Sequence, residues 1–302
     1  MMTRNRLLTI FLTLVASISL LAMAGCGGGG EGEGGDGAQK SGEGQTVKLV
    51  YVNWAEGIAM TNLCKVILED QMGYEVQLRV ADVGPVYTSV AQGDQDAFMD
   101  AWLPVTHESY MEEYGDKLVD YGYNYEGARI GLVVPTFVTI DSITQMNAHA
   151  EKFGKEIVGI DAGAGIMKAT DRAIEAYDLD FTLLPSSGPA MTAALKDAVE
   201  NEEWVAVTGW KPHWKFARWD LKFLADPQEV YGAVENIHCI ARQGLEQDMP
   251  QVAQFLKNFK MNDQTLGGLM GMIAESEEDD PETAARKWMM QNMDLVNGWI
   301  PE

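Results

Sequence analysis

The sequence predicts an α/β fold with two lobes, each a mostly parallel sheet flanked by helices. Strand-like and helix-like runs alternate from Thr46 onward, which is typical of parallel sheets. The alternation falls into two blocks, about 46–130 and 142–232, and a helical tail without its own sheet follows. Of the 302 residues, 46% are hydrophobic, enough to build real cores. We expect the tail to pack on the first block, so the chain crosses between the lobes twice, near Val133–Thr136 and His238–Ala241.

The first block is predicted from apolar runs. Thr46–Trp54 is apolar and β-branched, which favours a strand, and Glu56–Met72 carries apolar residues at helical spacing. The further elements expected in this block are the strand Tyr74–Ala81, the helix Val86–Gln92, the strand Gln95–Trp102 and the helix Thr106–Tyr114 with Thr106 as its N-cap. The apolar run Ile130–Val138 then leads into the second block.

The second block repeats the alternation with shorter strands. Its expected elements are helix 142–153, strand 156–161, helix 165–177, strand 181–185, helix 189–201, strand 204–209, helix 212–218 and strand 221–224. Val234–Ala241 is a further strand, and Pro250–Ile300 is helical. Within that tail, Asp280-Pro281-Glu282 predicts a helix start, because proline is favoured at the first helical position.

The N-terminus has the features of a secretory signal. Arg4 and Arg6 precede the uncharged run Leu7–Ala22, which is short for a spanning helix. The sequence Leu-Ala-Met-Ala-Gly-Cys resembles a bacterial lipobox, and this resemblance makes Cys26 the lipidated first residue of the mature protein. A permanent signal anchor is the alternative. We therefore assign 1–25 to a lipoprotein signal peptide.

A flexible linker separates this signal from the folded body. Half of the residues in 26–45 are glycine and most others are polar, so the segment cannot pack. The expected domains are then lobe I, from 46–134 plus 241–302, and lobe II, 135–240. A lipid-anchored body of this kind would sit at the cell membrane, facing the periplasm or the outside.

Composition excludes several classes of function. The chain holds 45 acidic against 22 basic residues, a net charge of −23, which disfavours binding to nucleic acid. It also argues against a basic face held to anionic lipid. With three cysteines, neither a disulfide framework nor a cysteine-based zinc cluster is expected. Cys64 and Cys239 lie in apolar stretches and are interpreted as buried free thiols rather than a pair.

Tryptophans mark the strand ends that would face a ligand. In open α/β sheets, ligands bind beyond the carboxyl ends of the strands. Trp54 and Trp102 end two expected strands of the first block, and Trp210 follows one in the second. Each tryptophan alone is more commonly core packing. Three at equivalent positions indicate an aromatic cage, which suits a cation without hydrogen-bond donors, such as a trimethylammonium group.

A glycine turn provides a possible second anchor. Gly163-Ala164-Gly165-Ile166 opens a helix, where the first backbone N–H groups favour an anion. Lys168 stands where a dinucleotide-binding turn has its third glycine, so that interpretation is weak. His107, five residues after Trp102, is a candidate donor to the same anion, although a lone histidine is more often a capping or surface residue. Cage and anion pocket together describe a zwitterion, with no metal and no cofactor.

The body resembles the glycine betaine/proline betaine substrate-binding lipoproteins of bacterial ABC importers, a family with a two-lobed periplasmic-binding-protein (Venus flytrap) fold. The resemblance covers nearly all of 46–300 and rests on motifs that occur in order. These motifs are Asn53-Trp54 with Ala59–Asn62, Asp100–Pro104 with His107, Val133–Thr136, Gly159–Asp161 with Gly163–Ile166, Thr208–Trp210 with Pro212–Trp214, Asp226-Pro227 and Trp288.

The resemblance implies a site and partners. Three tryptophans would box the ammonium group, and a histidine with two backbone amides would hold the carboxylate. The residues so implied are Trp54, Trp102, Trp210, His107, Gly165 and Ile166. The chain would capture a betaine as an osmoprotectant and deliver it to a permease powered by an ATPase, without being an enzyme.

Two alternatives remain open from the sequence. A receptor of the same fold for choline or carnitine would use the same cage. A secreted esterase acting on choline-like substrates is less favoured, because no Gly-x-Ser-x-Gly motif occurs and Ser186-Ser187-Gly188 lacks a matching context. His107-Glu108 does not start a zinc helix either, since Met111 stands where the second histidine is needed.

Overall fold

The computed structural model describes residues 42–276 and 280–302. The expected signal peptide 1–25, the lipidation site Cys26 and all but the end of the linker 26–45 lie outside the described residues. The described part belongs to a single unit of the chain, Gln39–Glu302.

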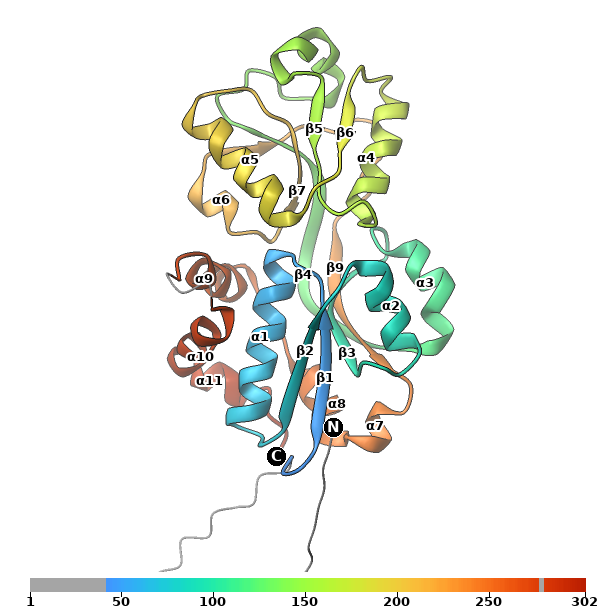
Figure 1. The fold of residues 1–302 in the computed structure, drawn as a ribbon, viewed down its shortest axis with the longest axis vertical. Coiled ribbons are helices and arrows are strands. Elements are labelled where there is room, and N and C mark those ends of the chain that lie inside the picture. Colours follow the sequence, from blue (N-terminus) through green and yellow to red (C-terminus); the bar gives the residue numbers. More distant parts are fainter. Residues whose placement is uncertain (1–41, 277–279) are drawn as a thin grey trace, which may run out of the picture. The chain divides into compact units, whose positions relative to one another are not determined.

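The strands pair in the order β2-β1-β3-β9-β4-β7-β5-β6, with β8 also paired to β4. Their bounds are β1 Thr46–Tyr51, β2 Glu75–Val80, β3 Ala97–Leu103, β4 Leu118–Pro135, β5 Glu156–Val158, β6 Thr182–Leu184, β7 Val207–Lys211, β8 Leu221–Phe223 and β9 Glu235–Arg242. We call β1, β2, β3, β9 and the first part of β4 sheet A, and we call β5–β8 with the last part of β4 sheet B (Figure 1).

The expectation of mostly parallel sheets needs correction, because the pairing is mixed. β1 runs parallel to β2 and β3, and β5 runs parallel to β6 and β7. β4 and β9 are antiparallel to their neighbours. β4 is 18 residues long; it pairs with β9 over Leu118–Ala128 and with β7 and β8 over Arg129–Pro135. One strand therefore belongs to both sheets, where the sequence predicted only the apolar run 130–138.

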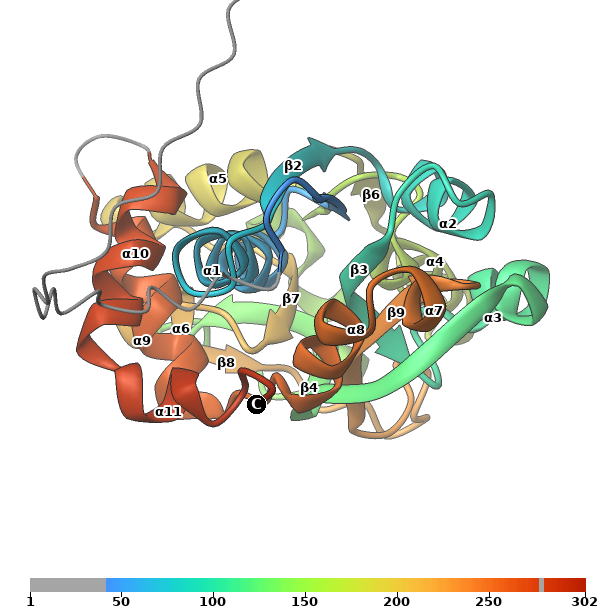
Figure 2. The ribbon, with the colours of Figure 1, turned by 90° about the horizontal axis from the view of Figure 1, so that it is seen from below.

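Helices α1 (Ala55–Asp70) and α2 (Val83–Ala91) lie on opposite faces of the parallel strands of sheet A (Figure 2). The next helix, α3 (Glu108–Tyr114), has His107 at its N-cap position and not Thr106 as predicted, and the His107 side chain makes no cap hydrogen bond. The Thr106 side chain has another partner, since its hydroxyl donates to the Glu235 carboxylate on β9.

Sheet B is covered by α4 (Gly165–Ala176), α5 (Gly188–Glu200) and the short α6 (Lys215–Arg218), as Figure 1 shows. The expected helix 142–153 is instead two 3₁₀ segments, Ile143–Gln145 and Asn147–Phe153. A non-helical backbone at His149 interrupts the second segment.

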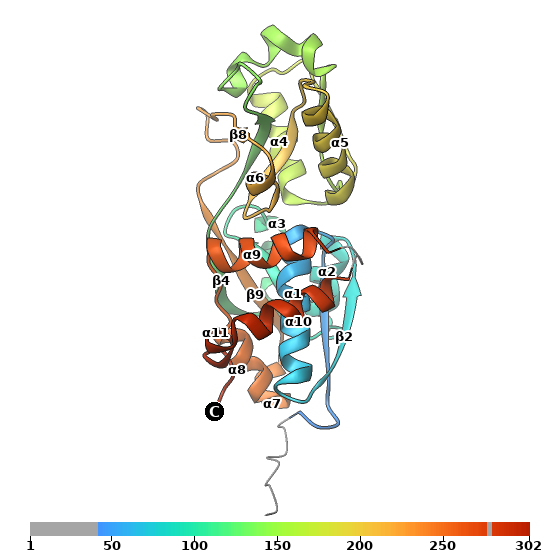
Figure 3. The same ribbon diagram turned by 90° about the vertical axis from the view of Figure 1, so that its left-hand side faces the viewer.

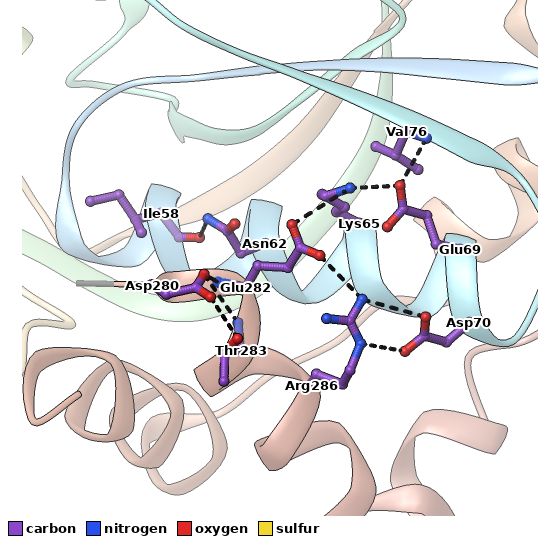
Figure 4. Close-up of polar contacts among 10 residues, drawn as sticks. All are labelled: Ile58, Asn62, Lys65, Glu69, Asp70, Val76, Asp280, Glu282, Thr283 and Arg286. Carbon is purple, nitrogen blue, oxygen red and sulfur yellow. Dashed lines mark hydrogen bonds and ion pairs between the residues drawn. The ribbon is translucent and has the colours of Figure 1, made fainter. Parts of the chain in front are cut away.

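The helical tail packs back on the first block, as predicted. Its helices are α7 Leu245–Asp248, α8 Pro250–Asn258, α9 Asp263–Ala274, α10 Pro281–Gln291 and α11 Met293–Asn297. In Figure 3, α9 and α10 lie against α1. Arg286 on α10 donates to Asp70 on α1 at 2.7 Å (Figure 4). The predicted start of α10 is confirmed, because the Asp280 carboxylate accepts from the N–H groups of Glu282 and Thr283.

Two further expectations concern buried residues and membranes. Cys64 and Cys239 are both buried and free, as predicted. Across the residues the structure describes, no helix is both long enough and apolar enough to cross a bilayer.

Candidate functional site

A small pocket lies between sheet A and sheet B, lined by strand, helix and loop residues of both. Its lining residues are Trp54, Glu56, Trp102, Thr106, Ile130, Ile160, Ala164, Gly165, Ile166 and Trp210. Five of the six ligand-binding residues expected from the sequence are therefore brought together here, and they come from segments far apart in the chain. His107, the sixth, is fully buried beside them, with its ring centroid 5.9 Å from that of Trp54.

Each of the three tryptophans is oriented by an acidic side chain. The Trp54 indole N–H donates to Asp161 at 3.3 Å, that of Trp102 to Asp100 at 2.9 Å, and that of Trp210 to Glu56 at 2.8 Å. A buried indole N–H needs an acceptor, and a fixed acceptor fixes the ring plane. Each ring plane is thus fixed in this arrangement, and the Trp54–Asp161 and Trp210–Glu56 bonds also join the first block to the second.

Glu56 and Asp100 are site residues that sequence reasoning missed. Both are fully buried, and burial raises the pKa of Glu56 to about 7 and that of Asp100 well above its usual range. Each has one oxygen, Oε1 of Glu56 and Oδ2 of Asp100, without a hydrogen-bond partner among the described residues. For Asp100 a signal was available, because it stands two positions before Trp102 inside an apolar run, where the indole is one of few possible partners. Glu56 offered none, since its indole partner Trp210 is 154 residues away in the chain.

Lys215 was also missed. It is fully buried at the start of α6, and its Nζ lies over the Trp210 ring, 4.2 Å from the centroid. Burial lowers the pKa of Lys215 to about 7, although the Glu56 carboxylate opposes this shift. His213 lies against the same ring with centroids 5.0 Å apart. The back of the aromatic cluster is therefore lined by titratable groups.

His107 is positioned as a neutral donor. Burial, followed by the charge of Lys168, lowers the pKa of His107 to about 3, so the ring is uncharged at neutral pH. Its Nδ1 accepts from the backbone N–H of Trp102 at 3.1 Å, which places the ring proton on Nε2. Within the described residues, Nε2 has no partner. An N–H is thus left to donate to an incoming acceptor.

The start of α4 needs glycine. A Cβ on Gly165 would lie 2.0 Å from the carbonyl oxygen of Thr106, so any larger residue would push α4 away from the loop after β3. Ala164 is extended, and the first N–H groups of α4, those of Gly165 and Ile166, have no acceptor within the helix. They offer donors beside the pocket.

Contacts next to the pocket join α3 to α4. The Tyr110 hydroxyl donates to the carbonyl oxygen of Gly163 at 2.8 Å, and the Lys168 ammonium donates to Ser109 at 3.0 Å. Lys168 also lies over the Tyr110 ring, 4.7 Å from its centroid. These contacts hold the two sides of the pocket together.

In the part of the chain that the structure describes, no group of three His, Cys, Asp or Glu side chains is arranged to hold a metal ion.

Comparison with known proteins adds independent findings. A family described as the substrate-binding domain of the ABC-type glycine betaine transport system matches residues 45–291. The glycine betaine/carnitine transport binding protein GbuC of Listeria monocytogenes is 46% identical over 152 residues, which are 49% of this chain and 50% of that relative. The matched segment thus spans about half the length of this curated relative.

Two solved structures are similar over most of the chain. The glycine betaine/L-proline-binding protein ProX of Borrelia burgdorferi has 36% identity and a TM-score of 0.82, covering 85% of this chain and 97% of ProX. An ABC-transporter choline-binding protein in complex with choline has 28% identity and a TM-score of 0.78, covering 84% of this chain and 91% of that protein.

Proposed function

Because the chain belongs to the family of substrate-binding domains of ABC-type glycine betaine transport systems, we propose that it captures glycine betaine or a related betaine in the pocket described above. This family consists of transport binding proteins and not of enzymes, which confirms the expectation of a non-catalytic role. The observation that carries the proposal is the pocket lined by Trp54, Trp102 and Trp210, each with its indole N–H bound to a carboxylate.

The three tryptophans would hold the trimethylammonium group. A cation desolvated against an indole face gains about 2 kcal/mol, so three faces supply about 6 kcal/mol before costs. Glu56 and Asp100 lie beside these rings, and a bound cation would favour their ionised forms. Micromolar binding requires about 8 kcal/mol net, so a second anchor is needed.

The carboxylate would bind to the donor group, which we define as His107 Nε2–H and the backbone N–H groups of Gly165 and Ile166. The unpartnered Nε2 of His107 supports this role, since a buried donor without a partner is costly unless a ligand satisfies it. A neutral imidazole and helix amides bind a carboxylate without adding a cation that would repel the ammonium group.

We further propose that the body consists of two lobes that close on the ligand, with lobe I formed by 46–134 plus 241–302 and lobe II by 135–240. The partners of β4 change between Ala128 and Arg129, which supports a hinge on this strand slightly before the expected boundary. The close approach of Gly165 to Thr106 supports a closed state in which the lobes touch at the pocket. The ligand would then act by stabilising that state.

Delivery and anchoring complete the proposal. The closed protein would dock on a membrane permease driven by an ATPase, the arrangement that the family description names as a transport system. We propose an extracytoplasmic location, with a lipid on Cys26 and the segment 26–45 as tether.

Choline is the second candidate ligand, because a choline complex is among the similar structures. Choline carries the same ammonium group but has no carboxylate, so the donor group would stay unsatisfied at a cost of roughly 1–3 kcal/mol. Carnitine, which the name of GbuC includes, does have a carboxylate. We therefore expect the affinity order to place glycine betaine ahead of choline.

A tryptophan fluorescence titration against glycine betaine, proline betaine, carnitine, choline and unmethylated glycine tests the function. We expect saturable changes with the methylated zwitterions, weaker binding of choline and none of glycine. Equal affinity for glycine and glycine betaine would contradict the aromatic cage.

A further inference from the structure

Behind the tryptophans, three ionisable side chains are completely buried. Glu56, Asp100 and Lys215 come from α1, β3 and α6, and none is exposed to solvent. In the described chain, Glu56 Oε1, Asp100 Oδ2 and Lys215 Nζ find no hydrogen-bond partner. A buried charge without a partner is costly, so an unsatisfied cluster facing a binding pocket points to a role in binding.

The Lys215 ammonium group lies close enough to the proposed site to compete with the ammonium group of the ligand. Its Nζ is 4.2 Å from the centroid of the Trp210 ring, and the same indole donates its N–H to Glu56 at 2.8 Å. Glu56 in turn lines the pocket. The Lys215 ammonium therefore shares one aromatic ring and one carboxylate with the proposed site of the trimethylammonium group.

We propose that the ligand's ammonium group and the Lys215 ammonium group compete for the Trp210 ring and the Glu56 carboxylate, so that ligand binding expels one proton from Lys215 to solvent. This inference rests on the proposed function. The N–H bond of Lys215 is the bond that breaks; the amine keeps the electron pair and becomes neutral, and the buffer takes up the proton. Glu56 is the counter-ion of the bound ligand, and any proton that its carboxyl group holds is expelled to the buffer as well.

The electrostatics of the cluster support this exchange. Desolvation lowers the pKa of Lys215 to about 7 and raises that of Glu56 to about 7, so protons here are loosely held at neutral pH. The other groups that face the cluster are Asp100, whose pKa burial raises, and His213, whose pKa burial and Lys215 lower. An incoming permanent cation adds a like charge beside Lys215 and lowers its pKa further.

Calorimetric titration in two buffers of different ionisation enthalpy measures the proton directly. Glycine betaine has no group that titrates near pH 7, so any released proton comes from the protein. We expect about half a proton per ligand from Lys215 at pH 7, because a group with a pKa near 7 is about half protonated there, and a further contribution from Glu56. By linkage, affinity should rise at least about threefold between pH 6.5 and 7.5.

Variants assign the proton. Lys215→Met keeps an unbranched side chain on the Trp210 ring but has no amine, and should bind with clearly fewer protons released and a weaker pH dependence, the remainder coming from Glu56. Lys215→Arg keeps a charge that is not lost, and should bind more weakly, also with fewer protons released. Lys196→Met is the matched control, because Lys196 is an exposed lysine paired with Glu200 at 3.2 Å, and it should behave like wild type.

The outcomes separate the two proposals. Saturable binding with the same heat in both buffers would overturn the proton exchange and leave the proposed function intact. Proton release that is undiminished in Lys215→Met would overturn the assignment to Lys215. If no quaternary ammonium ligand binds the wild-type protein, the proposed function itself fails, and the proton exchange fails with it.

Discussion

The aromatic residues and the donor group around the pocket differ in how their charges are arranged. Trp54, Trp102 and Trp210 are each bound to the carboxyl group of an acidic residue, so the ionisable groups lie on that side of the pocket. The donor group instead uses helix amides and an uncharged imidazole, His107. Neutral donors can bind a carboxylate without repelling the nearby ammonium. This difference shows how a compact pocket can suit a zwitterion. The ionisable side chains of the pocket lie on one side, and neutral donors lie on the other.

The largest loss of affinity is expected when one of the three tryptophans is removed. Trp102→Ala should lower the affinity for glycine betaine by about 100-fold or more, because about 2 kcal/mol of cation–π attraction and the apolar contact are both lost. Trp299→Ala is the control, since Trp299 is equally buried but packs on Phe259 with centroids 4.6 Å apart. It should lower stability without changing affinity, and equal losses of affinity in calorimetry would refute the cage.

A substitution that keeps α4 away from the loop after β3 is expected to have the next largest effect on affinity. In Gly165→Ala, the new Cβ would meet the Thr106 carbonyl, which is 2.0 Å from its position, and affinity should fall by about 10- to 100-fold. Gly163→Ala is the matched control, because its Cβ would be 3.6 Å from the Tyr110 hydroxyl, an ordinary contact. Similar affinities for both variants would show that the approach of α4 does not matter for binding.

A substitution in the donor group should affect ligands with a carboxylate more than ligands without one. His107→Gln should weaken glycine betaine binding by about tenfold, the value of one hydrogen bond to a charged group. Choline, which has no carboxylate, should bind with nearly unchanged affinity. If titration with both ligands shows equal losses, His107 supports the fold and does not bind the carboxylate.

The smallest effect should come from the contact between α3 and α4. Tyr110→Phe removes the hydroxyl that donates to Gly163 at 2.8 Å but keeps the ring on which Lys168 lies. We expect the ligand to dissociate about threefold faster, because one surface hydrogen bond of the closed state is lost. Stopped-flow fluorescence measures this rate, and an unchanged rate would mean that the contact does not stabilise closure.

Much of the fold was predictable because its strongest signals are local. The apolar runs of β1 and β3 and the Asp280-Pro281 start of α10 need no knowledge of distant residues. The first part of β4 was missed, because Leu118–Arg129 mixes glycine and acidic residues with tyrosines and is stabilised as a strand by β9, a segment far away in sequence. The cap of α3 was misplaced for the same reason, since Thr106 bonds to distant Glu235.

The candidate site was predictable where strand ends carry distinctive residues. Trp54 and Trp102 could be grouped because the parallel strands β1 and β3 bring their carboxyl ends together, and Trp210 because it stands at the corresponding place on β7 of sheet B. Glu56, Asp100 and Lys215 could not, because their importance comes from complete burial, and burial of a charged side chain depends on the packing of three separate elements. Charged residues are rarely fully buried, so sequence alone favours a solvated interpretation.

A crystal structure of the complex with glycine betaine tests the central claim most directly. We expect the ligand nitrogen to lie within about 6 Å of the ring centroids of Trp54, Trp102 and Trp210. The carboxylate should accept from His107 Nε2 and the first amides of α4. A ligand bound elsewhere, or one whose ammonium group faces the donor group instead of the rings, would contradict the proposed binding site.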